Sequence, residues 1–420
     1  MTETVNERKN IMQYMGINYL RAKLAQKSVG VNRRYDYYEM KNLRNDPSPL
    51  IPVAMKESYK SILGWCGKSV DSLADRLMFN GFDPDTDFFN MNEIFDMNNK
   101  DILFDSAILG ALISACDFIY ISKDENGFPR LQVIDGRNAT GIIDPITNML
   151  TEGYAILERD AYNTPIVEAY FTKGQTDIIR KGEHKVTKET YPNSAPYALL
   201  VPIIYRPDAK RLFGHSRISR ACMDLMDKAR NTITRAEVAA EFYAFPQKYV
   251  VGMSEDAEPL DSWKATVSSM LQFTKDEDGG HPILGQFTTA SMTPHHEQLK
   301  MYASAFAGET GLTLDDLGFA TDNPSSADAI KAGHENLRLL ARKAQRTFGT
   351  GFLNTGYLAA CVRDNFEYKR TEIYQSIPVW RPLFEPDAAM LSGIGDAALK
   401  LAQAFPEYMT DKKLKEITGI

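Results

Sequence analysis

The amino-acid sequence predicts an α+β fold, and three observations support this prediction. Apolar residues recur every three or four positions over several long stretches, which is typical of helices. Short β-rich runs bounded by turn signals fill the region from residue 118 to 172. A helical pattern then runs from about residue 325 to 363, enough for a rod of roughly 55 Å. Because the 420 residues are 44% hydrophobic and 25% charged, the chain can bury large cores, and its length allows two or three domains.

The region before residue 117 is predicted to be mostly helical. We expect helices over residues 5–29, 52–79 and 91–116, with a polar, tyrosine-rich link over residues 33–45. In the second of these helices, the apolar side chains share one face. They are Met55, Tyr59, Ile62, Cys66, Val70, Leu73 and Leu77.

From residue 117 the sequence changes to strand patterns. Runs rich in β-branched and aromatic residues occupy residues 118–122, 131–135, 140–143, 153–159 and 166–172. Turn signals such as Glu125-Asn126-Gly127 and Asp144-Pro145 separate these runs. Residues 178–180 and 199–205 are expected to extend the sheet, which we predict to be mostly antiparallel.

The helical period returns over residues 216–243, and Pro246 ends this helix. Short strands are expected at residues 247–253 and 283–289, with a helix at residues 260–273 between them. A further helix begins at Thr293-Pro294, because proline is favoured at the first helical position, and it continues to about residue 309.

An acidic loop over residues 310–323 precedes the long helix, which Ser325 is placed to cap. The glycines of this helix are expected either to allow kinks or to let other elements pack closely against it. They are Gly333, Gly349, Gly351 and Gly356. Beyond the long helix we expect a strand at residues 367–373 and helices with breaks from residue 387 to the C-terminus.

The net charge of −7 argues against a protein that holds nucleic acid through bulk positive charge. The four cysteines, Cys66, Cys116, Cys222 and Cys361, lie far apart and are expected to be buried thiols rather than zinc ligands or disulfides. The polar N-terminus does not have the pattern of a signal peptide, and the apolar runs at residues 106–116 and 347–362 are too short to span a membrane. We therefore expect a protein made and kept in a cytoplasm.

Three segments resemble catalytic or ligand-binding motifs. Residues 64–69 resemble the end of a phosphate-binding loop, but Ile62 occupies the position of the first glycine, and no strand precedes the segment. His295 and His296 are adjacent on a helix, so their rings point about 100° apart and cannot share a metal ion. No serine, histidine and acid constellation is apparent.

The third segment, with Asp315, Asp316 and Asp322, could hold a divalent cation, as in a metal-dependent nuclease that processes DNA. No companion glutamate or lysine has nuclease spacing, and the alternative is an ordinary acidic surface loop. We therefore expect no enzyme activity, no metal and no cofactor.

The order of helix, small β-and-helix insert, helix, loop and very long helix resembles that of the portal proteins of tailed bacteriophages, the head–tail connectors of siphophages. Five segments carry the resemblance in the same order as in the family. They are SVDSLADRLMFNGF (residues 69–82), VPIIYRPDAKRLFGHSRIS (201–219), AEFYAFPQKYVVGM (240–253), LGQFTTASMTPHHEQLKMYASAFAGETGL (284–312) and NPSSADAIKAGHENLRLLARKAQRTFG (323–349). The likeness covers most of the chain from about residue 60 onward.

The resemblance implies a portal fold whose regions can be assigned along the chain. The regions are an α/β wing (1–205), a first stem helix (206–244), a small α/β clip (245–292), a second stem helix (293–310), a tunnel loop (311–324), a long kinked helix that returns to the wing (325–385) and a helical crown (386–420). The crown is shorter than in many portals.

The resemblance also implies the function and the partners. Members of the family form rings of twelve copies at one capsid vertex of the virion, and double-stranded DNA passes through the ring, without sequence specificity, during packaging and ejection. The implied partners are the terminase large subunit, which hydrolyses ATP, the head–tail adaptor, and the major capsid and scaffolding proteins. No membrane is involved.

Site residues follow from the implied regions. The tunnel loop would present Leu314, Asp315, Asp316, Leu317, Phe319, Thr321, Asp322 and Asn323 to the DNA channel. The clip would contact terminase or adaptor through Lys248, Tyr249, Val251, Trp263, Leu284 and Gln286. The stem would use Arg217, Asp224, Asp227, Lys228, Arg235, Glu241, Glu297 and Lys300 for contacts between subunits.

Overall fold

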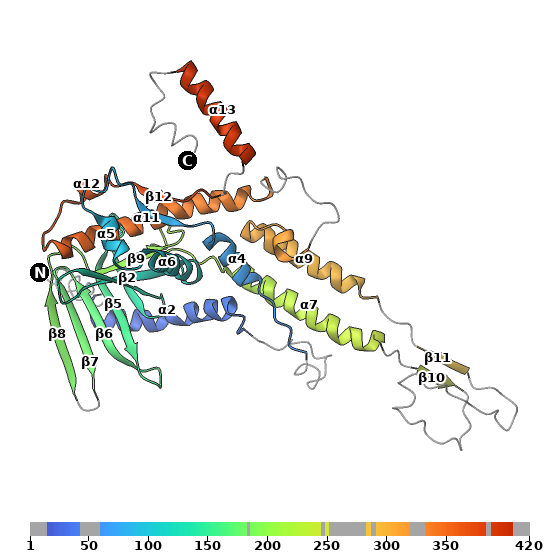
Figure 1. The fold of residues 1–420 in the computed structure, drawn as a ribbon. Helices are drawn as coiled ribbons and strands as arrows, with labels where there is room; N and C mark the ends of the chain where they lie inside the picture. The colour runs from blue at the N-terminus through green and yellow to red at the C-terminus, as the bar shows by residue number, and fades with distance from the viewer. Residues whose placement is uncertain are drawn as a thin grey trace, which may run out of the picture. The chain divides into compact units, whose positions relative to one another are not determined.

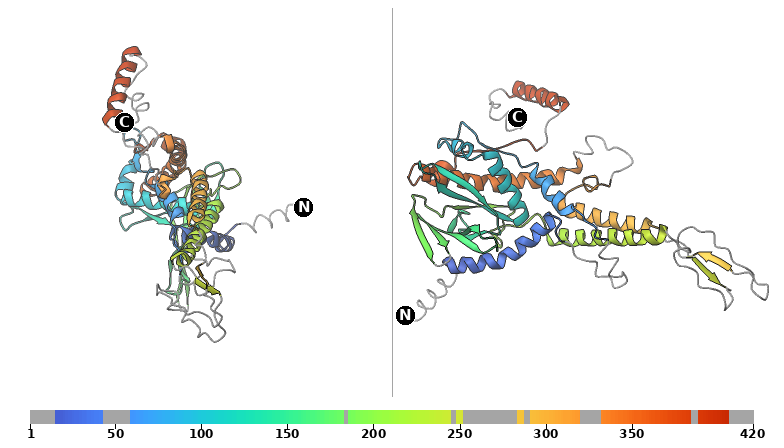
Figure 2. Two further views of the ribbon diagram at one scale, coloured as in Figure 1. Left: turned by 90° about the vertical axis from the view of Figure 1, so that its right-hand side faces the viewer. Right: turned by 60° about the horizontal axis from the view of Figure 1, so that its bottom comes forward.

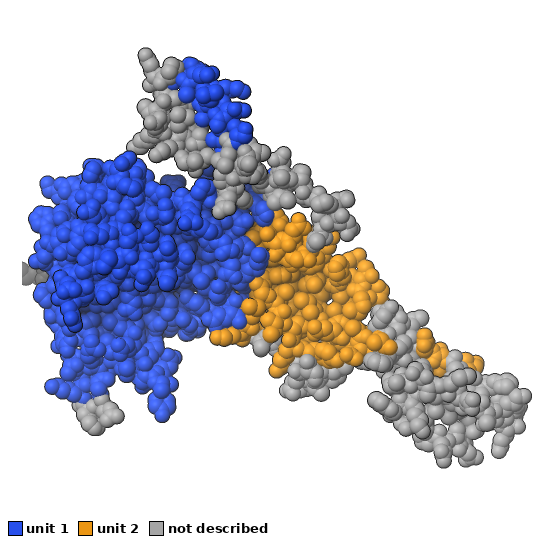
Figure 3. Space-filling model, in the orientation of Figure 1, with its two compact units in different colours: residues 1–39, 66–219, 325–420 blue, residues 40–65, 220–324 orange. Residues whose placement is uncertain are grey.

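The chain divides into two compact units, which Figure 3 shows in different colours. A computed structural model describes residues 15–42, 59–182, 185–244, 248–251, 283–286, 291–319, 332–383 and 388–405. Unit 1 contains residues 1–39, 66–219 and 325–420, and unit 2 contains residues 40–65 and 220–324. Most of unit 2 is therefore inserted into the chain of unit 1.

The described residues of unit 1 form a small two-stranded sheet and two larger antiparallel sheets, and the larger two are visible in Figure 1. The three-stranded sheet has the order β3–β2–β9, with bounds Pro129–Ile134, Cys116–Lys123 and Leu200–Ile204. The five-stranded sheet runs in sequence order through β4 (Ala139–Ile143), β5 (Leu150–Arg159), β6 (Pro165–Thr172), β7 (Gln175–Lys181) and β8 (Val186–Pro192). These strands confirm the predicted α+β class and its antiparallel sheet.

Three long helices pack against these sheets (Figures 1 and 2). Helices α6 (Lys100–Ser114) and α11 (Glu335–Arg363) both contact the three-stranded sheet. Helix α2 (Ile17–Tyr38) contacts α6 and strands β4 and β5. The middle of α11 is buried almost all round, from Phe348 to Val362, because neighbouring elements of unit 1 cover it.

An aromatic cluster forms one part of the core of unit 1. The Phe79 ring stacks on Phe352 at 4.8 Å between centroids and meets Phe104 edge-on at 4.6 Å. Phe79 belongs to β1 (Phe79–Phe82), which pairs antiparallel with β12 (Pro378–Trp380), so that Phe79 lies opposite Trp380. The cluster therefore joins an early segment of the chain to a segment about 300 residues later.

The glycines of α11 serve close packing, which was one of the two predicted roles. A β-carbon at Gly351 would come within 2.8 Å of the Ile203 side chain, and one at Gly356 within 2.6 Å of the Met91 sulfur. Met91 begins the short helix α5 (Met91–Asp96), which contacts α11. The absence of side chains at these glycines lets strand β9 and helix α5 approach the α11 backbone.

The carboxylate of Asp117 is buried between α6 and β2. Its Oδ1 accepts hydrogen bonds from the Ser114 hydroxyl at 2.8 Å and the Gly136 N–H at 3.0 Å. Burial raises the pKa of Asp117 to about 7, and nearby Asp135 acts in the same direction, while the two hydrogen bonds and Arg137 partly oppose the rise. Protonation of this group is therefore linked to the stability of unit 1.

A second buried carboxylate, Glu168 of β6, attaches α2 to the five-stranded sheet. It accepts hydrogen bonds from the Lys181 ammonium at 2.5 Å and from the Arg21 guanidinium of α2, whose Nε lies 3.1 Å away. Burial alone would raise the pKa of Glu168, but these two cations more than offset it and hold the pKa below the ordinary value. Lys23 of α2 adds a hydrogen bond to the Gly141 carbonyl at 2.6 Å.

The structure corrects several predicted boundaries before residue 117. Residues 33–38 were predicted to belong to a non-helical link, but they are helical. Helix α2 continues to Tyr38 and buries Val31 and Tyr37. The predicted helix at residues 52–79 is shorter. Residues 59–64 are not helical, α4 covers Trp65–Ala74, and β1 follows. The predicted helix at residues 91–116 is interrupted between α5 and α6, where Asn99 has a φ of 53°.

Corrections also apply to the second half of the chain. Helix α7 (Arg220–Ala244) begins four residues later than predicted. The predicted start of the long helix, with Ser325 as its cap, lies outside the described residues, so it stays a prediction, and α11 accounts for the rest of that helix. The strand predicted at residues 367–373 is wrong, because Arg370–Ile373 form the short helix α12. Helix α13 (Ala388–Ala404) confirms the predicted helical C-terminal region.

All four cysteines are buried and none of them forms a disulfide, which confirms the expectation of buried thiols. Among the helices of the described ranges, none combines the length and the apolar character needed to cross a bilayer.

Candidate functional site

Two antiparallel helices, α7 and α9 (Thr293–Thr310), form the centre of unit 2 (Figures 1 and 2). Their facing sides are apolar and mostly small, with Cys222, Met226 and Ala229 buried on α7 and Ala303, Phe306 and Ala307 buried on α9. The Thr232 hydroxyl lies 3.3 Å from the side-chain oxygen of Gln298 across the pair. Helix α9 has the predicted bounds to within one residue, and its Pro294 lies in the first turn as expected.

A non-helical segment of unit 2, residues 59–64, lies along this helix pair, and Trp65 follows it as the first residue of α4. The Ser61 hydroxyl is 3.0 Å from the Thr234 hydroxyl, and the Tyr59 hydroxyl donates to Glu241 at 2.7 Å. Trp65 packs on Phe306 with 5.5 Å between ring centroids. The sequence analysis predicted a helix over this segment, because its apolar residues have helical spacing. Ser61 and Gly64 give only a weak signal against a helix.

The predicted stem residues fall into different environments. Arg217 lies in unit 1 before α7 and is buried, with its Nε donating to the Ser69 carbonyl at 3.2 Å. Arg217 was predicted to be a stem residue that contacts neighbouring subunits. Its side chain is instead buried just before α7, where it anchors the chain that enters that helix. Asp224 and Lys228 form an exposed ion pair of 2.7 Å one turn apart on α7.

Two of the remaining stem residues on α7 make contacts within unit 2. Asp227 accepts a hydrogen bond from the Asn42 amide at 3.1 Å, and Glu241 binds Tyr59. Three further predicted stem residues are exposed: Arg235 on α7, and Glu297 and Lys300 on α9. These three side chains and the Asp224–Lys228 pair therefore lie on the exposed surfaces of the two helices.

The acidic segment after α9 forms a compact turn, η1 (Asp315–Leu317). One oxygen of Asp316 accepts hydrogen bonds from the backbone N–H and the hydroxyl of Thr313, at 2.9 and 3.0 Å. Gly318 closes the turn with a φ of 88°. Asp315 points to solvent, so the two adjacent carboxylates have different roles, one structural and one exposed.

The apolar residues around this turn are partly buried. Leu314, Leu317 and Phe319 have intermediate exposure, and the Phe319 ring lies 6.2 Å from that of His296 on α9. Thr321, Asp322 and Asn323 lie outside the described residues. Within the residues that the structure describes, no group of three or more histidine, cysteine, aspartate or glutamate side chains is placed to hold a metal ion.

The two short strands predicted in this region are present as β10 (Lys248–Val251) and β11 (Ile283–Gln286). They form an antiparallel pair, with Lys248 opposite Gln286 and Val250 opposite Leu284. The exposed side chains include Tyr249, Val251 and Ile283. The Tyr249 ring crosses Gly285, where a β-carbon would lie 2.3 Å from it. Trp263 and the helix predicted at residues 260–273 lie outside the described residues.

A family profile and two curated relatives that match this chain all describe phage portal proteins. The family profile described as "Phage portal protein, SPP1 Gp6-like" matches residues 20–393. The portal protein of Mycobacterium phage L5 is 23% identical over 384 residues, which cover 87% of this chain and 77% of that protein. The portal protein of Mycobacterium phage D29 is 25% identical over 390 residues, with the same coverage of 87% and 77%.

Similar solved structures come from GTA particles. A chain from the neck of an empty GTA particle has a TM-score of 0.47 and 13% identity, covering 90% of this chain and 95% of that chain. A chain from the neck of a native GTA particle has a TM-score of 0.44 and 13% identity, covering 93% and 99%.

Proposed function

Since this chain belongs to the SPP1 Gp6-like family of phage portal proteins, we propose that identical copies of it form a closed ring at one capsid vertex of a virion. Double-stranded DNA enters the head through this ring during packaging and leaves through it during ejection. The family match over residues 20–393, which includes most of both units, carries this proposal.

The elements of the two units suit the regions of a portal subunit. The sheets and helices of unit 1 before Ser219 correspond to the proposed wing (residues 1–205), and α7 and α9 correspond to the stem. Strands β10 and β11 correspond to the clip, η1 to the tunnel loop, α11 to the long helix and α13 to a short crown.

The stem helices suit the size and charge of a DNA channel. Helices about 10 Å wide from about a dozen copies, standing side by side, would place their axes on a circle about 38 Å across and leave a bore of about 28 Å. The net charge of −7 per copy disfavours tight binding of phosphates, which basic side chains would promote through counterion release. A conduit of this charge lets DNA slide without being held.

The turn η1 supports a tunnel-loop role, because it presents one free carboxylate at a defined position. Asp316 holds the turn through Thr313, while Asp315 faces solvent and would repel passing phosphates. Leu314, Leu317 and Phe319 would contact a neighbouring subunit or touch DNA without ionic bonds. We extend the same role to Thr321, Asp322 and Asn323.

The clip is the proposed contact for the terminase large subunit and later for the head–tail adaptor. The exposed side chains of Tyr249 and Val251 on β10 support this role, and we include Lys248, Trp263, Leu284 and Gln286. Major capsid and scaffolding proteins are the proposed partners of the wing. The family is structural rather than catalytic, so we assign no reaction to this chain.

Negative-stain electron microscopy of the purified protein tests this function. We expect rings of about a dozen subunits with a central hole, and a stable monomer at high concentration would contradict the proposal. The same preparation, incubated with Mg²⁺ and linear DNA, should leave the DNA intact. Cleavage that Asp315→Ala abolishes would instead support a metal-dependent nuclease.

A further inference from the structure

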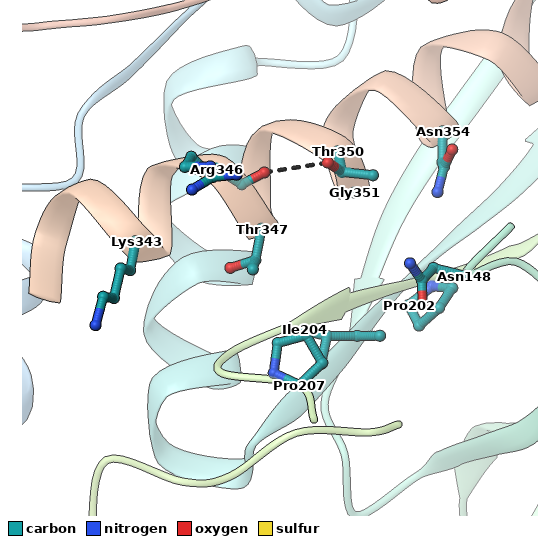
Figure 4. Close-up of a pocket in the computed structure, with 10 residues that line it drawn as sticks. All are labelled: Asn148, Pro202, Ile204, Pro207, Lys343, Arg346, Thr347, Thr350, Gly351 and Asn354. Carbon is teal, nitrogen blue, oxygen red and sulfur yellow. Dashed lines mark hydrogen bonds between the residues drawn. The ribbon is translucent and has the colours of Figure 1, made fainter. Parts of the chain in front are cut away.

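Unit 1 contains a pocket of about 440 Å³ between α11 and the end of β9, shown in Figure 4. One face of α11 forms a wall of the pocket, because Lys343, Arg346 and Asn354 recur at helical spacing along it. The opposite wall consists of the apolar residues Pro202, Ile204 and Pro207, with Asn148 beside Pro202 as its polar member. The pocket therefore combines a polar helix face with a hydrophobic surface.

The polar side of the pocket consists of hydrogen-bond donors and cations. Lys343 and Arg346 are exposed at the rim, whereas Asn354 is only 1% exposed. The Asn354 side-chain oxygen accepts a hydrogen bond from the Tyr374 hydroxyl, which in turn accepts one from Arg370 at 2.8 Å. This arrangement orients the Asn354 amide, whose nitrogen points into the pocket in Figure 4.

The charge of the pocket is opposite to that of the chain. None of the residues that line it carries a carboxylate, although the protein has a net charge of −7. Two cations and an inward amide N–H group favour a ligand with negatively charged oxygen atoms. The wall of Pro202, Ile204 and Pro207 favours apolar groups beside that charge.

We propose that this pocket binds an acidic peptide segment of a protein partner. One carboxylate of the segment lies between Lys343 and Arg346, and a neighbouring apolar side chain packs against Ile204 and the two prolines. A peptide fits better than a single phosphate, because about 440 Å³ lies within the range of roughly 300–1,000 Å³ that is typical of pockets for ligands of many atoms. It also fits better than nucleic acid, because a phosphate backbone requires a row of cations rather than two at one pocket.

Fluorescence anisotropy of a labelled peptide tests this proposal with the full-length protein. The probe is an acetylated, amidated hexapeptide of alternating leucine and glutamate. We expect saturable binding to the wild type and about tenfold weaker binding to Lys343→Gln and to Arg346→Gln, since each removes a charge-assisted contact. Arg342→Gln is the matched control, because Arg342 is an exposed cation on the same helix but does not line the pocket.

Thermal unfolding of each variant checks that the substitutions leave the fold intact, as expected for exposed side chains. Four results would overturn the proposal. The first is that the wild type does not bind the peptide at millimolar concentration, and the second is that a peptide with glutamine in place of glutamate binds as tightly as the original. The third is that Arg342→Gln weakens peptide binding as much as Lys343→Gln and Arg346→Gln do. The fourth is that millimolar inorganic phosphate or a short DNA duplex displaces the peptide. The last result would assign the pocket to a small oxyanion or to nucleic acid.

Discussion

Gly110 of α6 and Asp117 of β2 pack so closely that a β-carbon on Gly110 would lie 1.7 Å from Oδ2 of the aspartate. The Asp117 side chain cannot turn away, because its other oxygen is held by Ser114 and by the Gly136 N–H. A helix residue without a side chain is therefore required where α6 crosses this carboxylate.

Replacing Gly110 with alanine should lower the free energy of unfolding by about 2 kcal/mol, because the new methyl group must displace a buried, hydrogen-bonded carboxylate. Urea unfolding followed by circular dichroism measures the change. Gly30→Ala is the control, since Gly30 lies in α2 and nothing lies within 4 Å of its β-carbon position. That substitution should be neutral or stabilising by up to about 1 kcal/mol. Equal stability of the Gly110 variant and the wild type would contradict the steric argument.

Asp117 should make the protein less stable as the pH rises from about 4 to about 7. Its pKa in the folded protein is raised to about 7 from an ordinary value of 3.8, so the folded state binds the proton more tightly than the unfolded chain. The resulting stabilisation is complete below the ordinary pKa and is lost as the pH rises through about 7. Asp117→Asn keeps the acceptor oxygen but cannot ionise.

The measurement is the melting temperature of both proteins between pH 5 and 8. The free energy of unfolding of the wild type should fall by up to about 1 kcal/mol per pH unit relative to that of Asp117→Asn in this window, and its melting temperature should fall accordingly. Parallel curves would show that the carboxyl group does not titrate there.

Glu168 should have the opposite pH dependence. Its pKa is depressed in the folded protein, so its stabilisation is present above the ordinary value of 4.5 and is lost as the pH falls below it. Glu168→Gln removes both ion pairs and should cost about 2 kcal/mol at neutral pH, since Arg21 and Lys181 remain partly hydrated.

Hydrogen exchange of the α2 amides is the most direct readout, because Arg21 joins α2 to the sheet through this carboxylate. Exchange should accelerate in Glu168→Gln at neutral pH and in the wild type in acid. Glu158→Gln makes the same charge change at an exposed position of β5 and should leave α2 protected. Equal exchange in the two variants would rule out the role of Glu168.

Asp315→Lys should increase the affinity of assembled rings for linear duplex DNA, because it adds a cation to the proposed tunnel loop. The slope of log affinity against log salt should become steeper by about 1 for each new phosphate contact. Filter binding across a salt series measures both quantities. Asp36→Lys, on the exposed side of α2, makes the same change in net charge and should have little effect. If the two variants bind DNA equally, η1 does not face the channel.

The sequence predicted the elements whose patterns arise from burial. Strands β2 to β6 match within a few residues because each buries alternate or continuous apolar side chains and is bounded by turn residues. Strand β8 was missed because nearly all of its residues are exposed, and it exists only through pairing with β7. Residues 367–373 have strand-like composition but form α12, where Arg370 donates to the distant Thr147 carbonyl.

The sequence predicted the parts of the candidate site whose residues follow a local pattern of burial. Helices α7 and α9 have apolar faces that the sequence shows, whereas the burial of Arg217 depends on its hydrogen bond to Ser69, 148 residues away in sequence. The pocket between α11 and the end of β9 was not predicted, because Lys343 and Arg346 resemble ordinary surface charges until β9 is placed beside them. Contacts between distant segments leave no local pattern to detect.

The pairing of Phe79 with Trp380 has a consequence for biosynthesis. A ribosome adds about 5–20 residues per second, so β1 waits on the order of tens of seconds for β12 to emerge. During this interval Phe79 and Phe104 have no α11 to cover them, and their exposed rings favour aggregation. Nascent chains should therefore depend on chaperones until translation passes residue 380, and truncated chains that end before β12 should be insoluble.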